Sequence, residues 1–317
     1  MSNNIRTSII NKLLELMPPQ TKPVDYLSDI LDISKESAYR RLSGKMSFDI
    51  EELVTLSEEL GFSLDELVAL SDRNSKIVID IKVEKDPKQG FMERMKRFKK
   101  SIDDRLSDEY SYSVAALNYL PSELCVHYNN LFKLSYYIWL YWKDQNLHRT
   151  KYSEVEISPE LEKLRKSIES NVKQTKNNTL ILDPNVFLGP LNLVLYFHSL
   201  NLITEDEKKV IKEELHSMLD SMEKEIRCED LLDVRNFYYL SNLNIDVNSG
   251  YYSWNDNTAS FFSFNFFNRI VINKPEIYEA HKEWFLSLKR HSILITGSDE
   301  MAQAKYFRKQ REYVNRL

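Results

Sequence analysis

The sequence predicts a mainly α-helical protein of the α+β class, with a five-helix unit at the N-terminus and a larger helical domain that holds a small antiparallel sheet. Three observations support this fold class. In residues 5–70, apolar residues recur at helical spacing between capping residues. Helical patterns dominate again in residues 91–227. From residue 236 onward the apolar residues alternate with a period of two, which is typical of strands.

The N-terminal pattern begins with three helices. An apolar stripe in residues 5–17 predicts the first, and a second helix is expected to end near Asp32. The hydroxyl group of Ser34 can cap a third helix, whose inward side carries Ala38. Gly44 is placed to end that helix in the left-handed conformation. These residues predict two short helices joined by a tight turn, with one more helix before them.

Two further helices complete the N-terminal unit. Ser47 or Asp49 can cap the fourth helix, and Gly61 is expected to end it. Ser63 and Glu66 then form an S-x-x-E capping box, in which each side chain can bond the backbone N–H of the other residue. This box predicts that a fifth helix follows directly.

The outward face of the third helix is polar and basic. Its exposed arc is expected to hold Glu36, Ser37, Tyr39 and Arg40, with Lys35 and Arg41 at the flanks and Lys45 just beyond its end. A helix with such a face can lie in the major groove of DNA. Arg40 points most directly away from the core and can reach guanine O6 and N7, while Ser37 and Tyr39 can touch bases or phosphates. Lys35, Arg41 and Lys45 are better placed for phosphates. The alternative for Arg40 is a surface ion pair with Glu36, worth only a few tenths of a kcal/mol.

Residues 38–67, AYRRLSGKMSFDIEELVTLSEELGFSLDEL, resemble the Cro/repressor-like helix-turn-helix domains of the XRE type. Gly44 matches the glycine that follows the recognition helix of that family, and residues 47–67 match its L-x-x-L-a-x-x-L-G-x-S-x-x-x-L ending. Asp32 and Leu42 depart from the family, which often has Gly and Glu at these two positions. The resemblance implies sequence-specific DNA binding through the third helix.

The charge of the N-terminal unit is unusual for a DNA-binding domain, which is generally basic. Residues 1–72 contain seven Lys or Arg against thirteen Asp or Glu, a net charge of about −6. Four of the seven basic residues lie between Lys35 and Lys45, whereas the acids lie mostly on the later helices. We therefore expect a unit that is basic at its reading face and acidic behind it. The alternative is a protein-interaction module that reuses this fold and has no DNA target.

The remaining composition argues against catalysis and against a membrane protein. The chain of 317 residues has six glycines, none close enough to another for a phosphate-binding loop or a dinucleotide fingerprint. Its six histidines lack zinc-ligand spacing, and its two cysteines, with no paired spacing and no secretory leader, indicate a reducing compartment. The longest apolar stretches are too short to cross a bilayer. We expect a cytoplasmic protein that is not an enzyme, with no catalytic residues, no cofactor, no metal and no membrane partner.

Changes in composition divide the chain into three segments. Residues 1–73 form the helix-turn-helix domain, residues 74–90 a linker, and residues 91–317 an α+β domain. Alternating apolar residues predict one strand at residues 77–83, within the linker. Residues 91–106 predict an amphipathic helix with a basic face. The simpler interpretation packs this helix on the core of its own domain, and the alternative is that it couples two subunits.

The second domain is expected to be helical at first and to form its sheet late in the chain. Helices are predicted in residues 122–145, 159–173, 190–200, 204–227, 275–290 and 298–317, and strands in residues 111–121, 236–246, 250–256, 258–272 and 291–296. Thr204 and Glu207 form a capping box at the start of one helix. Three consecutive strands from residue 236 onward are expected to pair as an antiparallel sheet.

Two places in the second domain can hold an effector. The aromatic clusters in residues 128–142 and 237–267 can line an apolar pocket, although such clusters more often form core. Gly297 and Ser298 offer backbone N–H groups at a helix N-terminus, but Asp299 follows them and repels an anion. Either a small molecule or a protein can serve as the effector, and the sequence does not identify which one.

The sequence thus predicts a bacterial transcription regulator that binds double-stranded DNA. It is expected to bind a pseudo-palindromic operator as a homodimer, because two reading helices at a fixed spacing match two half-sites one helical turn apart. The second domain would then dimerise, sense an effector, or do both.

Overall fold

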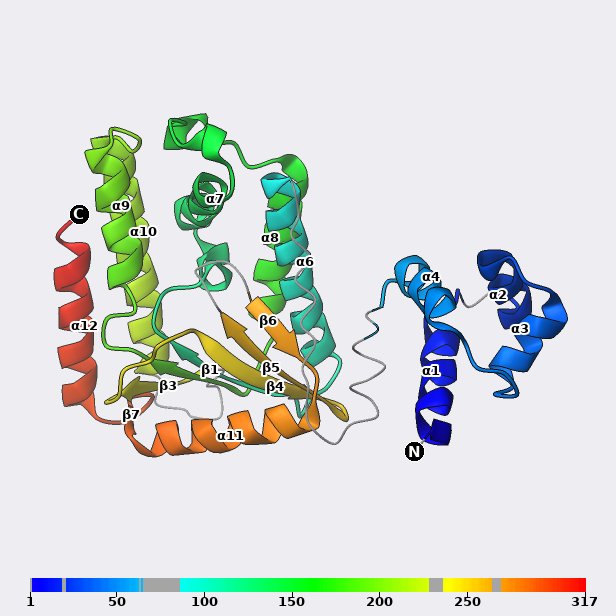
Figure 1. Cartoon of the computed structure of the whole chain (residues 1–317). Helices are drawn as coiled ribbons and strands as arrows, with labels where there is room; N and C mark the ends of the chain where they lie inside the picture. The colour runs from blue at the N-terminus through cyan, green and yellow to red at the C-terminus, as the bar shows by residue number, and fades with distance from the viewer. Residues whose placement is uncertain (1, 19–20, 63, 65–85, 228–235, 264–268) are drawn as a thin grey trace. The chain divides into compact units, whose positions relative to one another are not determined.

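The computed structural model describes residues 2–18, 21–62, 64, 86–227, 236–263 and 269–317. The chain divides into two units, residues 1–81 and 82–317, whose helices and strands are labelled in Figure 1. Each unit has a hydrophobic core of its own. Among the described helices, none is both long and apolar enough to span a membrane.

The N-terminal unit packs its described helices around one small core. They are α1 (Ser2–Leu16), α2 (Pro23–Leu31), α3 (Lys35–Leu42) and α4 (Ile50–Leu60). Each helix contributes one fully buried side chain: Leu13, Leu27, Ala38 and Leu56, respectively. The first four predicted helices are confirmed, while the predicted fifth helix and its capping box lie outside the described residues.

The connection between α2 and α3 takes the conformation that its residues favour. Asp32 ends α2 with φ of +50°, a left-handed conformation that Asp tolerates better than most residues. Ser34 caps α3, and its hydroxyl oxygen accepts a hydrogen bond from the Ser37 N–H at 3.2 Å. Gly44 follows the helix with φ of +73°, where a side chain would be strained. Short capping interactions therefore fix both ends of α3.

Helix α4 begins at a full capping box. Asp49, rather than Ser47, is its N-cap, and the Asp49 carboxylate accepts the Glu52 N–H at 2.8 Å. The Glu52 carboxylate in turn accepts the Asp49 N–H at 3.1 Å. Gly61 ends the helix in the left-handed conformation, as its position predicts. Glu52 also has a partner outside this box, described below.

The second unit is built on a seven-stranded mixed sheet with the order β6-β5-β4-β1-β2-β3-β7. Its strands are β1 (Tyr112–Leu117), β2 (Asn178–Leu182), β3 (Asn236–Ser241), β4 (Ser249–Trp254), β5 (Asn257–Ser263), β6 (Arg269–Ile272) and β7 (Ser292–Leu294). The three central strands β1, β2 and β3 run parallel, and the remaining pairs are antiparallel. The prediction of a small antiparallel sheet is therefore wrong in both respects.

The central strands explain the difference. The β2 sequence, NTLIL, has no period-two pattern, because a parallel strand in the middle of a sheet is covered on both faces. Strand β3 pairs with β2 and β7 instead of with the next strand in sequence. Parallel pairing requires long crossovers, which here contain α8 (Pro159–Val172) before β2, and α9 (Leu188–Ser199) with α10 (Glu205–Ile226) before β3.

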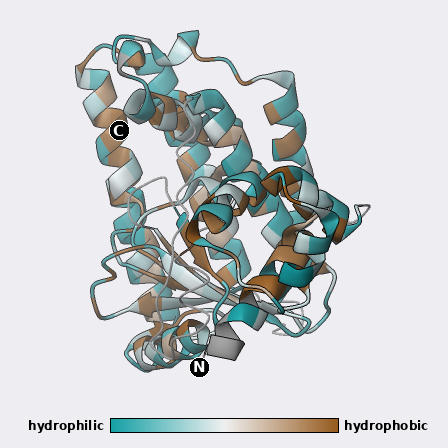
Figure 2. Ribbon diagram, turned by 45° about the vertical axis from the view of Figure 1, so that its right-hand side comes forward, coloured by the Kyte–Doolittle hydropathy of each residue, from teal (hydrophilic) through white to brown (hydrophobic). Residues whose placement is uncertain are grey.

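Helices cover both faces of the sheet (Figure 1). On one face stand α6 (Pro87–Leu106), α7 (Asn129–Lys143), α8, α9, α10 and α12 (Glu300–Val314). On the other face α11 (Pro275–Arg290) packs Phe285 and Leu288 with Ala116 of β1 and Ile181 of β2. Figure 2 shows hydrophilic and hydrophobic residues alternating around the helices, as expected for helices with one face on a core.

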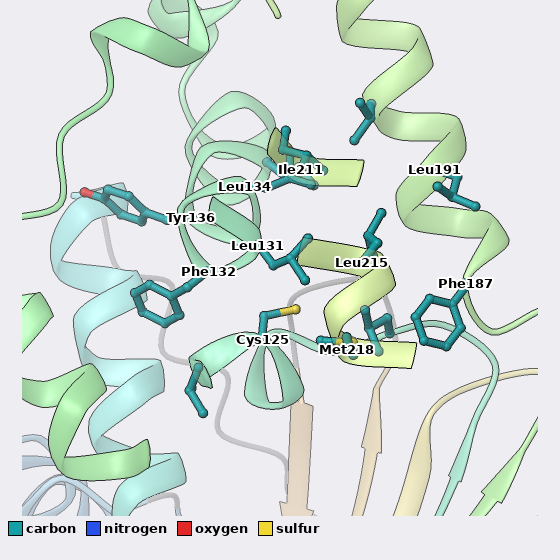
Figure 3. Close-up of a cluster of buried hydrophobic side chains, with 14 of the residues drawn as sticks. Cys125, Leu131, Phe132, Leu134, Tyr136, Phe187, Leu191, Ile211, Leu215 and Met218 are labelled. Carbon is teal, nitrogen blue, oxygen red and sulfur yellow. The ribbon is translucent and has the colours of Figure 1, made fainter. Parts of the chain in front are cut away.

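The larger core lies between the sheet and the first group of helices. Leu131 of α7, Leu191 of α9 and Leu215 of α10 belong to one buried cluster, and the Cys125 thiol joins it (Figure 3). Burial raises the pKa of this thiol to about 12. The aromatic residues in 128–142 mostly enter the same core, so that cluster is structural.

Two predicted elements are each divided in the structure. The helix expected at residues 122–145 is a 3-10 helix, η1 (Ser122–His127), followed by α7, because Tyr128 between them is extended. The strand expected at residues 258–272 is the antiparallel pair β5 and β6. The capping box of Thr204 and Glu207 at the start of α10 is confirmed.

Helix α6 uses its apolar stripe inside its own unit. It begins at Pro87, within the predicted linker, and its side chains Phe91, Met95 and Ile102 are fully buried. The structure supports the simpler interpretation, in which this helix packs on the core of its own unit, and Phe98 of the stripe is partly buried there as well. The strand predicted at residues 77–83 lies outside the described residues.

Candidate nucleic-acid interface

Helix α3 buries one side and exposes the other as its spacing predicts. Ala38 is fully buried, whereas the next residue, Tyr39, is 55% exposed. Glu36 and Arg40 are exposed as well. None of the ion pairs among the described residues involves Arg40, so the alternative pair with Glu36 is not formed. The Arg40 guanidinium is therefore available to an external acceptor.

Ser37 is less accessible than its neighbours on this face. Its backbone N–H donates to the Ser34 hydroxyl oxygen, and the two hydroxyl groups lie 3.0 Å apart in a second hydrogen bond. The carbonyl oxygen of Ser37 also accepts a bond from Arg41 Nη1 at 3.3 Å. Ser37 is thus engaged at the N-terminus of α3 and is half-buried.

Arg41 does not lie on the exposed flank where the helical spacing puts it. The residue is 7% exposed, and its Nε donates to Glu52 Oε2 at 2.8 Å while Nη2 bonds Glu52 Oε1. Nη1 contacts the Met46 sulfur at 3.4 Å. The prediction that Arg41 faces outward is wrong, because a carboxylate eleven residues further along holds it between α3 and α4. The Arg41 guanidinium thus joins α3 to α4, and its predicted contact with a DNA phosphate stays a prediction.

The two predicted phosphate-binding lysines are exposed. Lys35 Nζ lies 2.7 Å from an Asp25 carboxylate oxygen, in a pair whose side chains are 71% and 43% exposed. This hydrogen bond lowers the pKa of Asp25 and raises that of Lys35. Lys45 Nζ lies 6.0 Å from the ring centroid of Tyr39, at the limit of a cation–π contact. Lys45 and Tyr39 therefore lie on the same side of the unit.

Arg6 is a basic residue of this region that helical spacing does not reveal. From α1, its Nη1 donates to the Gly44 carbonyl oxygen at 3.0 Å and its Nη2 to the Ser47 hydroxyl at 2.6 Å. These bonds tie α1 to the loop that carries Lys45. A long sequence separation hides this contact, and the basic residue type is the only signal for it.

The structure thus gathers the exposed polar and basic side chains of α3 and its following loop on a small, well-packed helical unit. Residues 3–83 match the family model of the BetR domain. The name of that family is associated with DNA binding and so points coarsely to a regulator. No curated protein and no solved structure matches the chain.

The BetR domain match covers the N-terminal unit apart from its first two residues. It includes every residue predicted to contact DNA: Lys35, Glu36, Ser37, Tyr39, Arg40, Arg41 and Lys45. The resemblance to the XRE type is a separate prediction, which the BetR match leaves untested. The α+β unit, apart from its first two residues, lies outside the match.

At the second predicted effector site, the helix N-terminus after Gly297 and Ser298, side chains of the chain itself make the capping hydrogen bonds. At the start of α12 the Asp299 carboxylate accepts the Ala302 N–H at 2.9 Å. Gln303 Nε2 donates to the carbonyl oxygen of Ser298 at 2.9 Å. The helix N-terminus at Gly297 therefore presents a carboxylate to an approaching anion, which disfavours the anion.

Proposed function

We propose that the N-terminal unit is a helix-turn-helix domain that reads DNA through α3, and that the chain is a sequence-specific transcription regulator. The observation that carries the proposal is that the four basic residues in and after α3 differ in exposure. Lys35, Arg40 and Lys45 are exposed, while Arg41 is buried in an ion pair that holds α3 against α4. The coarse hint of the BetR domain name agrees with this function.

Rigid support of α3 suits sequence reading. A side chain distinguishes bases only when its donors are held in register with the base edges. The Ser34 cap, the Asp32 turn and the Arg41 ion pair fix the start, the entry angle and the inner side of α3. In this arrangement Arg40 would read a base, and Lys35 and Lys45 would contact phosphates.

We further propose that the protein acts as a homodimer on a pseudo-palindromic operator. The net negative charge of residues 1–72 gives a single copy weak attraction to DNA. Tethering a second copy raises its effective local concentration to about the millimolar range. The second unit would supply that tether.

Selection of bound fragments from a random duplex library tests the proposal. The full-length protein should enrich a motif with two related halves, and the Arg40→Ala variant should fail to enrich it. Lys12→Ala on α1 is the charge-matched control, and it should enrich the same motif as the unmodified protein.

The competing function is a protein-interaction module. The salt dependence of the affinity for duplex DNA distinguishes this function from DNA reading. When a protein contacts phosphates, the logarithm of its affinity for DNA falls steeply with the logarithm of salt concentration. Failure of the library to yield any motif, together with a flat salt dependence, would favour that function.

A further inference from the structure

The second unit contains a pocket of its own, formed by residues of that unit alone. Its volume is about 820 Å³, which is within the range of small-molecule sites. It opens between the parallel strands β1, β2 and β3 and the helices α6, α8 and α10, and η1 also contributes to its lining. The BetR match does not include it.

One wall of the pocket is polar and continuous across the sheet. Ser113, Asn178 and Asn236 stand side by side at the amino ends of β1, β2 and β3. The Ser113 hydroxyl donates to Asn178 Oδ1 at 2.8 Å, and Asn178 Nδ2 donates to Asn236 Oδ1 at 2.9 Å. Asn236 Nδ2 then donates to a Glu225 carboxylate oxygen at 2.7 Å. This row of side chains has a carboxylate at one end.

Arg105 stands at the other end of the row. Its Nη1 donates to the Ser113 hydroxyl at 2.8 Å and to Asn178 Oδ1 at 2.7 Å. Both acceptors are neutral, and no ion pair among the described residues includes Arg105. Burial lowers the pKa of Arg105 to about 10. A guanidinium in such a place has lost much of its hydration and has gained no counter-ion in return.

The two carboxylates that line the pocket are already engaged elsewhere. Glu225 accepts bonds from Asn236 and from the Tyr238 hydroxyl at 2.9 Å. Glu169 pairs with Lys173 at 2.9 Å. Lys224 also lines the pocket but is exposed to solvent. Arg105 is therefore the desolvated cation of the lining that has no counter-ion among the described residues, and its Nε and Nη2 donors make no hydrogen bond to a described residue.

The rest of the lining is apolar and adaptable. Phe98, Leu124, Val172, Leu180, Met218 and Met222 face the pocket. Methionine side chains adjust to varied ligand shapes because they are unbranched and polarisable. The pocket thus joins one unmatched guanidinium to an apolar wall.

We propose that this pocket binds a small organic carboxylate with an apolar body. The carboxylate would accept paired hydrogen bonds from Nε and Nη2 of Arg105, the geometry in which Arg binds carboxylates most strongly. The apolar body would lie against Met218, Met222 and Leu180. The proposal concerns the α+β unit alone and does not depend on DNA binding.

Isothermal titration of the full-length protein with octanoate, 4-phenylbutyrate and octanamide tests the proposal. At least one carboxylate should bind saturably, and octanamide should bind about ten-fold more weakly than octanoate or worse, because it lacks the charge that Arg105 needs. Absence of saturable binding by both carboxylates would overturn the proposal. Equal affinity for octanoate and its amide would also overturn it.

Variants locate the binding. Arg105→Leu removes the cation, and Met222→Trp adds bulk to the pocket lining while keeping Arg105. Each should weaken carboxylate binding by about ten-fold or more. Arg290→Leu, at an exposed arginine of α11, is the matched control and should bind normally. Thermal melting reports whether Arg105→Leu still folds, and if it does not, Met222→Trp decides the question. Normal binding by Met222→Trp would place the ligand elsewhere and refute the site.

Discussion

Arg41 and Glu52 join α3 to α4 through two parallel hydrogen bonds between a guanidinium and a carboxylate. The same Glu52 carboxylate completes the capping box of α4. One carboxylate therefore positions two helices at once. The side chains are 8% and 13% exposed, so solvent screens the pair little.

We expect Arg41→Ala to destabilise the N-terminal unit by about 3 kcal/mol, because it leaves the Glu52 carboxylate buried without its partner. Urea unfolding of the full-length protein, with hydrogen exchange of α3 and α4 amides, measures the loss. Arg40→Ala, next to it but exposed, should change stability by no more than about 0.5 kcal/mol. Equal effects of the two substitutions would show that the ion pair contributes nothing particular.

Arg40→Ala should instead act on DNA recognition. At the selected operator we expect a loss of about 1–3 kcal/mol in binding and a relaxed preference at one base pair, because a guanidinium that bonds guanine is lost. Competition binding with single-base operator variants measures both effects. A uniform loss on every duplex would identify Arg40 as a phosphate contact only.

Lys45→Ala should weaken binding to all duplexes alike. It should also reduce the steepness of the plot of log affinity against log salt concentration by about one, because one phosphate contact is lost. Titrations at several salt concentrations measure the slope. Lys12→Ala, which removes a charge from α1, is the control and should leave the slope unchanged. A change of base preference in Lys45→Ala would assign Lys45 to base reading.

Assembly gives a further prediction. The full-length protein should sediment as a dimer, while residues 1–81 alone should bind the operator at least about 100-fold more weakly than the whole protein. Sedimentation and titration of both forms measure these properties. A monomeric full-length protein, with residues 1–81 binding as tightly as the whole, would remove the second unit from the mechanism.

The buried ring of His281 is expected to make the free energy of unfolding decrease in acid. The ring lies 4.4 Å from that of Phe262, and neither ring nitrogen has a hydrogen-bond partner among the described residues. Burial lowers the pKa of His281 to about 4. Because the unfolded chain takes up the proton near its usual pKa of 6.5, stability should fall as pH drops from about 6.5 to 4.

The His281→Phe variant should lose this pH dependence and should be more stable than the unmodified protein at pH 5. Thermal unfolding between pH 7 and pH 4.5 measures it. His216→Phe replaces a histidine that is more accessible and bonded to Asn315, and it should leave the slope in place. An unchanged slope in His281→Phe would show that another group titrates.

Local signals in the sequence account for most of the helices. Capping residues such as Ser34, Thr204 and Glu207 act within one helical turn, so their effect can be recognised without tertiary structure. The sheet is harder to predict from the sequence, because β2 is covered on both faces and its apolar and polar residues do not alternate. Its partners also come from segments separated by whole helices.

The candidate interface shows the same limit. Helical spacing correctly predicts that Arg40 is exposed, because Arg40 lies on the side of α3 opposite the buried Ala38. It misplaces Arg41, because Glu52 competes for the guanidinium from another helix. Helical or strand spacing cannot predict the pocket around Arg105, since its walls come from the strands β1, β2 and β3, the helices α6, α8 and α10, and the 3-10 helix η1, which only the fold brings together.

The row formed by Ser113, Asn178 and Asn236 also specifies how the parallel strands align. Side chains alternate between the faces of a strand, so sliding β2 by one residue would turn Asn178 toward the apolar side that packs on α11. It would also turn Ile181 toward the opposite face. Such a misaligned sheet would bury an amide without its partners, a penalty of about 1–3 kcal/mol, so the polar row selects one alignment of the three strands.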